Sequence, residues 1–264
     1  MNMYWREMAA NRKELIIWSV CLCLLVASGM VKYAAYAGSG QSAQLLTGLP
    51  PSLKALLGLG SFDPTTIRGY FALLFLYIEL ATATHAALLG SHIIAKEEQD
   101  KTTEFLMVKP VGRSAILTAK LGAAFTNVVM LNLITWGSSL ILVHHYSQSN
   151  PISREISLFM LSMLLVQMIF LALGTALAAG LPHAKSAGSA AVGILLFGYV
   201  ISRITSMTPA LNVLNVLSPF QYFSDANIVN GQGLRLPVIV WTTALLAVLV
   251  LSTYRAYQSR DLAV

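Results

Sequence analysis

The second long apolar run of the chain contains ionisable side chains that could carry protons. Glu79 and His85 lie within residues 70–95, most of which are apolar. A carboxylate at the centre of a membrane span costs about 2.5–3.5 kcal/mol, and each Leu or Ile of the span returns about 0.3–0.6 kcal/mol. Such groups usually face a protein interior, where they serve a proton relay or a polar contact between helices. The sequence leaves both roles open for Glu79 and His85.

Other motifs that would support chemistry on this chain are missing or incomplete. A phosphate-binding loop would read Gly-x-x-x-x-Gly-Lys-Ser/Thr, and the nearest approach, Ala184-Lys185-Ser186, lacks both glycines in register. Cys21 and Cys23 are two residues apart, so on a helix they point to nearly opposite sides and cannot share a metal ion or a disulfide. We therefore expect no catalytic residue, nucleotide, metal ion or cofactor on this chain.

A membrane-embedded protease is one alternative to a non-enzymatic reading. Glu97 and Glu98 beside an apolar run are similar to the Glu-Glu-x-x-x-Arg motif of intramembrane prenyl-protein proteases, but position 102 is Thr. No paired His motif is suitably placed on later runs, and the Gly-x-Ser-Gly motif of rhomboid-type proteases is absent. The protease is therefore the least favoured of the functions considered.

The composition requires that these residues be positioned by membrane-spanning helices. Of the 264 residues, 56% are hydrophobic and 11% are charged, under half the roughly 25% charge of a soluble chain. Apolar runs of about 20 residues span a bilayer as helices. The chain contains such runs at residues 15–36, 70–95, 115–143, 156–181, 187–204 and 236–254. We predict an all-α integral membrane protein, with residues 1–264 forming a single transmembrane domain.

Basic residues indicate the orientation, because Lys and Arg near span ends are retained in the cytoplasm. With both termini inside, most of the 17 basic residues lie on the inner side. The outer side then holds only Lys32, Lys54, Arg68, Arg154, Arg203 and Arg235. This topology predicts a multi-pass protein of the cell membrane with both termini and residues 96–114 in the cytoplasm.

The segments between and before the spans are expected to form shorter helices. Residues 1–18 mix aromatic and charged side chains, which predicts an amphipathic helix on the inner surface that turns into the first span. Residues 49–58 have Pro50 and Pro51 near their start and Gly58 at their end, as a short interfacial helix would. Leu211, Leu214 and Leu217 repeat every three residues, which predicts a re-entrant or interfacial helix before the last span.

The loop at residues 96–114 is the most densely charged part of the chain. It surrounds the apolar residues Phe105 and Leu106 with Glu97, Glu98 and Glu104. Asp100 can cap a short helix, which Pro110 and Gly112 would end. One helical turn cannot hide these apolar side chains, so the loop presents an apolar tip to a partner.

In this loop the sequence resembles the permease subunits of type 2 ATP-binding cassette (ABC) exporters. The family has a glutamate at the end of the second span, then a short loop with Thr, Glu, an apolar pair, Pro and Arg, and a Lys early in the third span. The matching residues, in order, are Glu97, Glu98, Thr103, Glu104, Phe105, Leu106, Pro110, Arg113 and Lys120. The number and order of the spans agree with the family over nearly the whole chain.

The resemblance implies a mechanism and partners. The loop would be a coupling helix seated in a groove of a separate ATP-binding cassette ATPase subunit, which would bind ATP and magnesium. Each permease chain would pair with its own ATPase and with a second permease chain, identical or paralogous, to export a substrate. An ion-coupled secondary transporter is the main alternative, and Glu79 is the group that would serve it. No basic stripe for nucleic acid is present.

Overall fold

The computed structural model describes residues 3–37, 65–99, 112–146, 152–223, 225–229, 231 and 233–259. All of the elements that these residues form are helices. The long helices are α1 (Met3–Ala37), α4 (Ile67–Gln99), α6 (Arg113–Tyr146), α7 (Ser153–Gly180), α8 (Ala187–Met207) and α10 (Leu236–Ser259). The short ones are η1 (Ala184–Ser186), η2 (Pro209–Leu217), η3 (Pro219–Gln221) and α9 (Asp225–Val229). The helix predicted at residues 49–58 lies outside the described residues.

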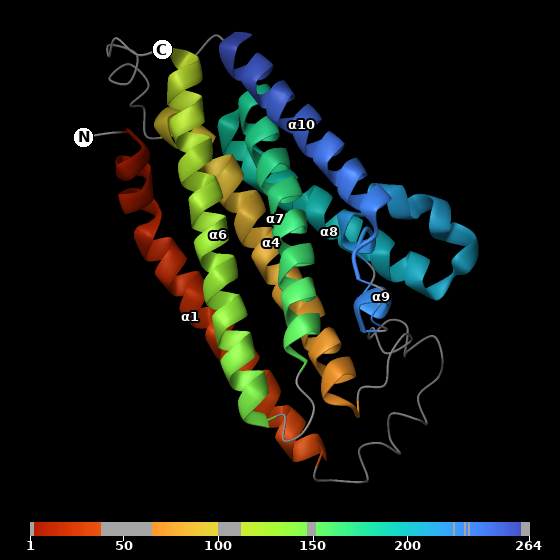
Figure 1. Ribbon diagram of the computed structural model, residues 1–264. Helices are drawn as coiled ribbons and strands as arrows, with labels where there is room; N and C mark the ends of the chain where they lie inside the picture. Colours follow the sequence, from red (N-terminus) through yellow and green to blue (C-terminus); the bar gives the residue numbers. More distant parts are fainter. Residues whose placement is uncertain are drawn as a thin grey trace.

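The six long helices are each long and apolar enough to cross a membrane, as the sequence predicted. They form an elongated bundle in which the beginning of α1 and the end of α10 lie at one end, together with the end of α4 and the beginning of α6 (Figure 1). We call this the upper end, as drawn. The arrangement is that of a multi-pass membrane protein.

Helix α1 shows how the apolar residues divide between protein and lipid. Leu15, Leu22, Val26 and Met30 follow one face of the helix and are buried against the bundle. Residues of the opposite face, such as Leu24 at 63%, are exposed although they are equally apolar. In a bilayer that face is solvated by lipid tails, so no burial within the protein is required of it.

The amino-terminal residues are helical, as predicted, and continue into the first span without a break. Helix α1 runs without interruption from Met3 to Ala37 and is about 52 Å long at 1.5 Å per residue, well beyond a hydrocarbon core of about 30 Å. Its first turns pack on α6, where the Tyr4 hydroxyl and Thr126 Oγ1 are 3.0 Å apart. This part of α1 therefore belongs to the helical bundle.

Helices α4 and α7 form the tightest contact of the bundle through two glycines. A Cβ atom added at Gly90 would collide with the backbone carbonyl of Leu171, and one added at Gly174 would collide with that of Ala87. Without a hydrophobic force between helices in lipid, such close backbone approach supplies much of the packing energy. Ala178 lies one turn after Gly174 on α7 and is fully buried as well.

This contact gives the first testable expectation. We expect Gly174→Val to destabilise the purified chain by about 1–3 kcal/mol, because a backbone carbonyl cannot move aside as a side chain can. The measurement is the unfolding midpoint in detergent. Gly193→Val is the matched control, since a Cβ atom at Gly193 of α8 meets nothing within 4 Å. Equal midpoints for the two variants would contradict the proposed role of this contact.

The segment after α8 folds back along that helix. Ser218 Oγ donates a hydrogen bond of 2.8 Å to the carbonyl of Gly198, which lies about 13 Å before the end of α8. Between them, η2 is a 3₁₀ helix with three residues per turn, so Leu211, Leu214 and Leu217 share one stripe. The predicted helix before the last span is therefore present, and its three-residue leucine repeat reflects 3₁₀ geometry.

Candidate functional site at the upper end of the bundle

The residues predicted to bind a partner lie only partly within the described structure. Glu97 and Glu98 are in the last turn of α4, and Arg113 is the first residue of α6. Thr103, Glu104, Phe105, Leu106 and Pro110 lie outside the described residues. The structure therefore describes the two helix ends that flank the predicted loop, which are the end of α4 and the beginning of α6.

A buried carboxylate joins the end of α4 to α1. Glu7 is fully buried, and its Oε2 lies 2.6 Å from Lys96 Nζ, whose side chain is only 16% exposed. Arg6 Nη2 lies 3.4 Å from the other oxygen, Glu7 Oε1. Buried charges are tolerated only when they are paired, so the Glu7 position is fixed by its partners.

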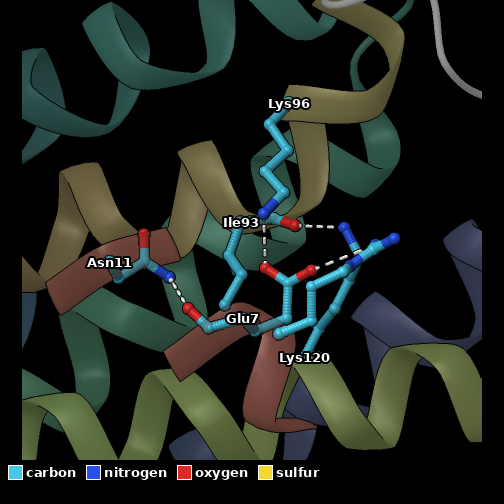
Figure 2. A network of polar contacts seen from close by, with 6 residues as sticks. Glu7, Asn11, Ile93, Lys96 and Lys120 are labelled. Atoms are coloured by element: carbon cyan, nitrogen blue, oxygen red, sulfur yellow. Dashed lines mark hydrogen bonds and ion pairs between the residues drawn. The ribbon is translucent and has the colours of Figure 1, made fainter. Parts of the chain in front are cut away.

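Lys120 brings α6 into the same group (Figure 2). Its side chain is fully buried, and its Nζ donates a hydrogen bond to the backbone carbonyl of Ile93 on α4. A cation near the carboxyl end of a helix is favoured, because the carbonyl dipoles point toward it. Helices α1, α4 and α6 are thus joined at the upper end by one polar group, which we call the Glu7 cluster: Glu7, Lys96, Lys120 and the Ile93 carbonyl.

The backbone of α1 is also held near the cluster. Asn11 is buried, and its Nδ2 donates a hydrogen bond of 3.0 Å to the Glu7 carbonyl one turn earlier (Figure 2). This bond satisfies a polar side chain that would otherwise be costly at this buried position. Glu7 therefore carries its carboxylate on a helical turn that the Asn11 side chain bridges with this hydrogen bond.

The beginning of α6 is joined to α10 by a different kind of contact. Arg113 Nη1 donates to the Gln258 carbonyl at 3.2 Å, and Gln258 Nε2 donates to Ser114 Oγ at 2.9 Å. Thr118 Oγ1 and the Tyr254 hydroxyl are 2.7 Å apart. All three contacts are exposed, whereas the Glu7 cluster is buried. The two sides of the loop are therefore anchored to different helices with different strengths.

The two polar residues predicted within the second span are separate from this site. Glu79 and His85 are both buried in α4, about 26 Å and 17 Å along the helix from Lys96. The His85 ring contacts the Trp18 ring of α1 edge-on at 5.3 Å between centroids. Within the described residues neither His85 nitrogen has a hydrogen-bond partner. Their role as a proton relay or a polar contact stays a prediction.

Sequence reasoning missed Glu7 and assigned Lys120 only by resemblance. Glu7 was expected among the charged residues of a surface helix, and the structure differs because α1 continues into the bundle and turns this side chain inward. One signal was available: Lys120 lies inside the third apolar run, where a lysine needs a buried partner. No group of three or more His, Cys, Asp or Glu residues that could hold a metal ion occurs in the described ranges.

Comparison with known proteins identifies the family. The family model described as ABC-2 family transporter protein matches residues 1–262, which is nearly the whole chain. A search of the curated proteins found no match. The match covers all six long helices and the loop between α4 and α6. The chain therefore belongs to the ABC-2 family of transporter proteins and is a membrane-spanning permease subunit of an ABC transporter.

Proposed function

We propose that this chain is the permease of an exporter driven by ATP that a separate ATPase subunit binds, with magnesium, and hydrolyses. The ATPase would bind residues 96–114 through Phe105 and Leu106, with Glu97, Glu98, Thr103, Glu104, Pro110 and Arg113 around them. Residues 1–264 would act as one permease domain in the cell membrane, with both termini cytoplasmic. A second permease chain, identical or paralogous, would complete the path.

The observation that carries this proposal is the anchoring of the loop on both sides. On one side, Lys96 of α4 forms a buried ion pair with Glu7 of α1. On the other, Arg113 contacts Gln258 of α10. A displacement of the loop is therefore passed directly to two further helices, as a coupling element requires.

The unequal strength of the two anchors suggests how the helices move. Breaking a buried ion pair costs about 3–5 kcal/mol, whereas an exposed hydrogen bond contributes about 0.5–1.5 kcal/mol. The upper ends of α1, α4 and α6 would then move as one body, and α10 would follow that body less closely. Helix α10 suits this role because only 11% of the residues in its most apolar stretch are buried inside the protein.

The division of labour is tested by comparing the chain alone with its complex. We expect the isolated permease in proteoliposomes to show no ATP hydrolysis, and the complex purified from native membranes to hydrolyse MgATP. Hydrolysis by the isolated chain would overturn the proposal. The physical reason is that the sequence has no phosphate-binding loop.

The direction of transport and its energy source are tested by a second experiment. Inverted vesicles expose their cytoplasmic face, so ATP added outside should drive accumulation of an exported substrate. The Glu79→Gln variant distinguishes an ATP-driven permease from an ion-coupled carrier, in which the buried Glu79 carboxylate would carry the coupling ion. We expect the variant to keep its ATP dependence and its insensitivity to a protonophore. Loss of transport together with proton dependence would favour the secondary transporter.

A further inference from the structure

A cavity lies between the segment that follows α8 and the first turns of α10. It has a volume of about 430 Å³ and is lined by Asn215, Gln221, Tyr222, Arg235, Val238 and Trp241, among others. Figure 1 shows η2 beyond α8, beside the beginning of α10 and away from the upper end. The cavity is therefore distinct from the Glu7 cluster and from the end of α4 and the beginning of α6.

The fold-back of the chain makes the wall of this cavity rigid. Gln221 Nε2 donates hydrogen bonds to the carbonyl and the hydroxyl of Ser202 on α8, at 2.8 and 3.1 Å. The Tyr222 hydroxyl donates to the carbonyl of Val216 at 2.5 Å. These bonds tie two lining residues to α8 and η2, so this part of the cavity wall is hydrogen-bonded to neighbouring helices.

The charge of the lining is one-sided. Arg235 contributes a guanidinium, and no carboxylate occurs among the described residues that line the cavity. Asn215 and Gln221, which carry amide side chains, line the same cavity. A guanidinium is a donor suited to planar or tetrahedral oxyanions, and its charge is costly near lipid unless it is paired. The polar part of the lining thus fits an anion.

The other part of the lining is apolar and open to lipid. Trp241 is 49% exposed and Val216 is 58% exposed, and both line the cavity. Tryptophan and tyrosine favour the boundary between head groups and acyl chains, where one end of the ring is apolar and the other is wet. A ligand could place its head beside Arg235 and extend a hydrocarbon chain past Trp241 into the membrane.

We infer that this cavity is a binding site for an anionic amphiphile of the surrounding membrane, whose oxyanion head pairs with Arg235. The arrangement of one cation, several amides and an aromatic exit matches a phospholipid with a net negative head. A zwitterionic lipid would bring its own cation next to Arg235 and bind less well.

The test is native mass spectrometry of the full-length chain, stripped of lipid and supplied with defined lipids. We expect one phosphatidylglycerol to remain bound in preference to phosphatidylcholine, and Arg235→Gln to weaken its retention roughly tenfold or more. Arg154→Gln is the matched control, because Arg154 is an exposed arginine at the beginning of α7 and does not line the cavity. Equal retention by the two variants would overturn the assignment.

A second measurement places the ligand in the cavity. Phosphatidylglycerol with brominated chains should quench Trp241, whose emission is obtained by subtracting the spectrum of Trp241→Phe, and Arg235→Gln should reduce the quenching. Inorganic phosphate serves as the headgroup without a chain and should not displace the lipid at millimolar concentration. Displacement by phosphate, or equal quenching by brominated phosphatidylcholine, would refute an anionic amphiphile as the ligand.

Discussion

Replacing Glu7 by Gln should destabilise the permease more than any other single substitution considered for it. The change keeps the size of the side chain but removes the charge that Lys96 Nζ contacts at 2.6 Å. Removing one partner of a buried ion pair costs about 3–5 kcal/mol, because the other charge stays buried without compensation. We expect the unfolding midpoint in detergent to fall on the order of 10 °C, by the scaling for domains of this size.

Two further variants make this expectation specific. Glu14→Gln removes the same charge from the same helix, but Glu14 is only partly buried and should lower the midpoint by no more than about 2 °C. The double variant Glu7→Gln with Lys96→Met removes both charges and should recover much of the loss, since an apolar replacement of a buried pair is often neutral. Equal midpoints for Glu7→Gln and Glu14→Gln would show that the buried pair does not stabilise the fold.

The same variants test whether the Glu7 cluster transmits movement. If α1 and α4 move together because of this pair, Glu7→Gln should lower the transport achieved for each ATP hydrolysed by the complex. Below the unfolding temperature, a purely structural role would leave that ratio unchanged. The ratio therefore separates coupling from stability.

The second large effect is expected when Phe105 and Leu106 are both changed to Asp. A buried Phe or Leu side chain contributes about 1.5–3 kcal/mol, so loss of both should weaken the contact with the ATPase by at least about 3 kcal/mol, more than a hundredfold. Two carboxylates in an apolar groove would weaken it further. The measurement is recovery, with the tagged permease, of a subunit that azido-ATP photolabels.

The control for this variant keeps the number of added charges. Leu262→Asp with Val264→Asp also replaces two apolar residues by acids, near the carboxyl terminus and outside residues 96–114. It should leave the labelled subunit bound. Membrane insertion should be normal for both double variants. Full recovery of the ATPase with the Phe105 and Leu106 variant would place the partner contact elsewhere.

Local patterns allowed much of the fold to be predicted. Each long helix of the bundle overlaps an apolar run read from the sequence, because a span of about 20 apolar residues has no other stable form in a bilayer. The three-residue leucine repeat at Leu211, Leu214 and Leu217 predicted a helix that the structure contains as η2. The continuity of α1 was not predicted, since charged residues near its beginning indicated a surface position.

The candidate site was likewise predicted only in part. Its loop was predicted because a run of charged and polar residues beginning at Glu97 is followed directly by the apolar residues Phe105 and Leu106. Its anchors could not be predicted, because Glu7 and Lys96 are 89 residues apart and either could have faced water. Only the packing of α1 on α4 shows that they meet.

By itself, the sequence determined that this protein spans the membrane and where its long helices lie, and it predicted the loop that a partner would bind. Those properties depend on hydropathy and spacing along a single segment. The tertiary structure decided that Glu7 and Lys120 are buried together with the end of α4, and that Arg235 and Trp241 share a cavity. Such contacts depend on which helix faces meet, and that is set by long-range packing, including the glycine contact between α4 and α7.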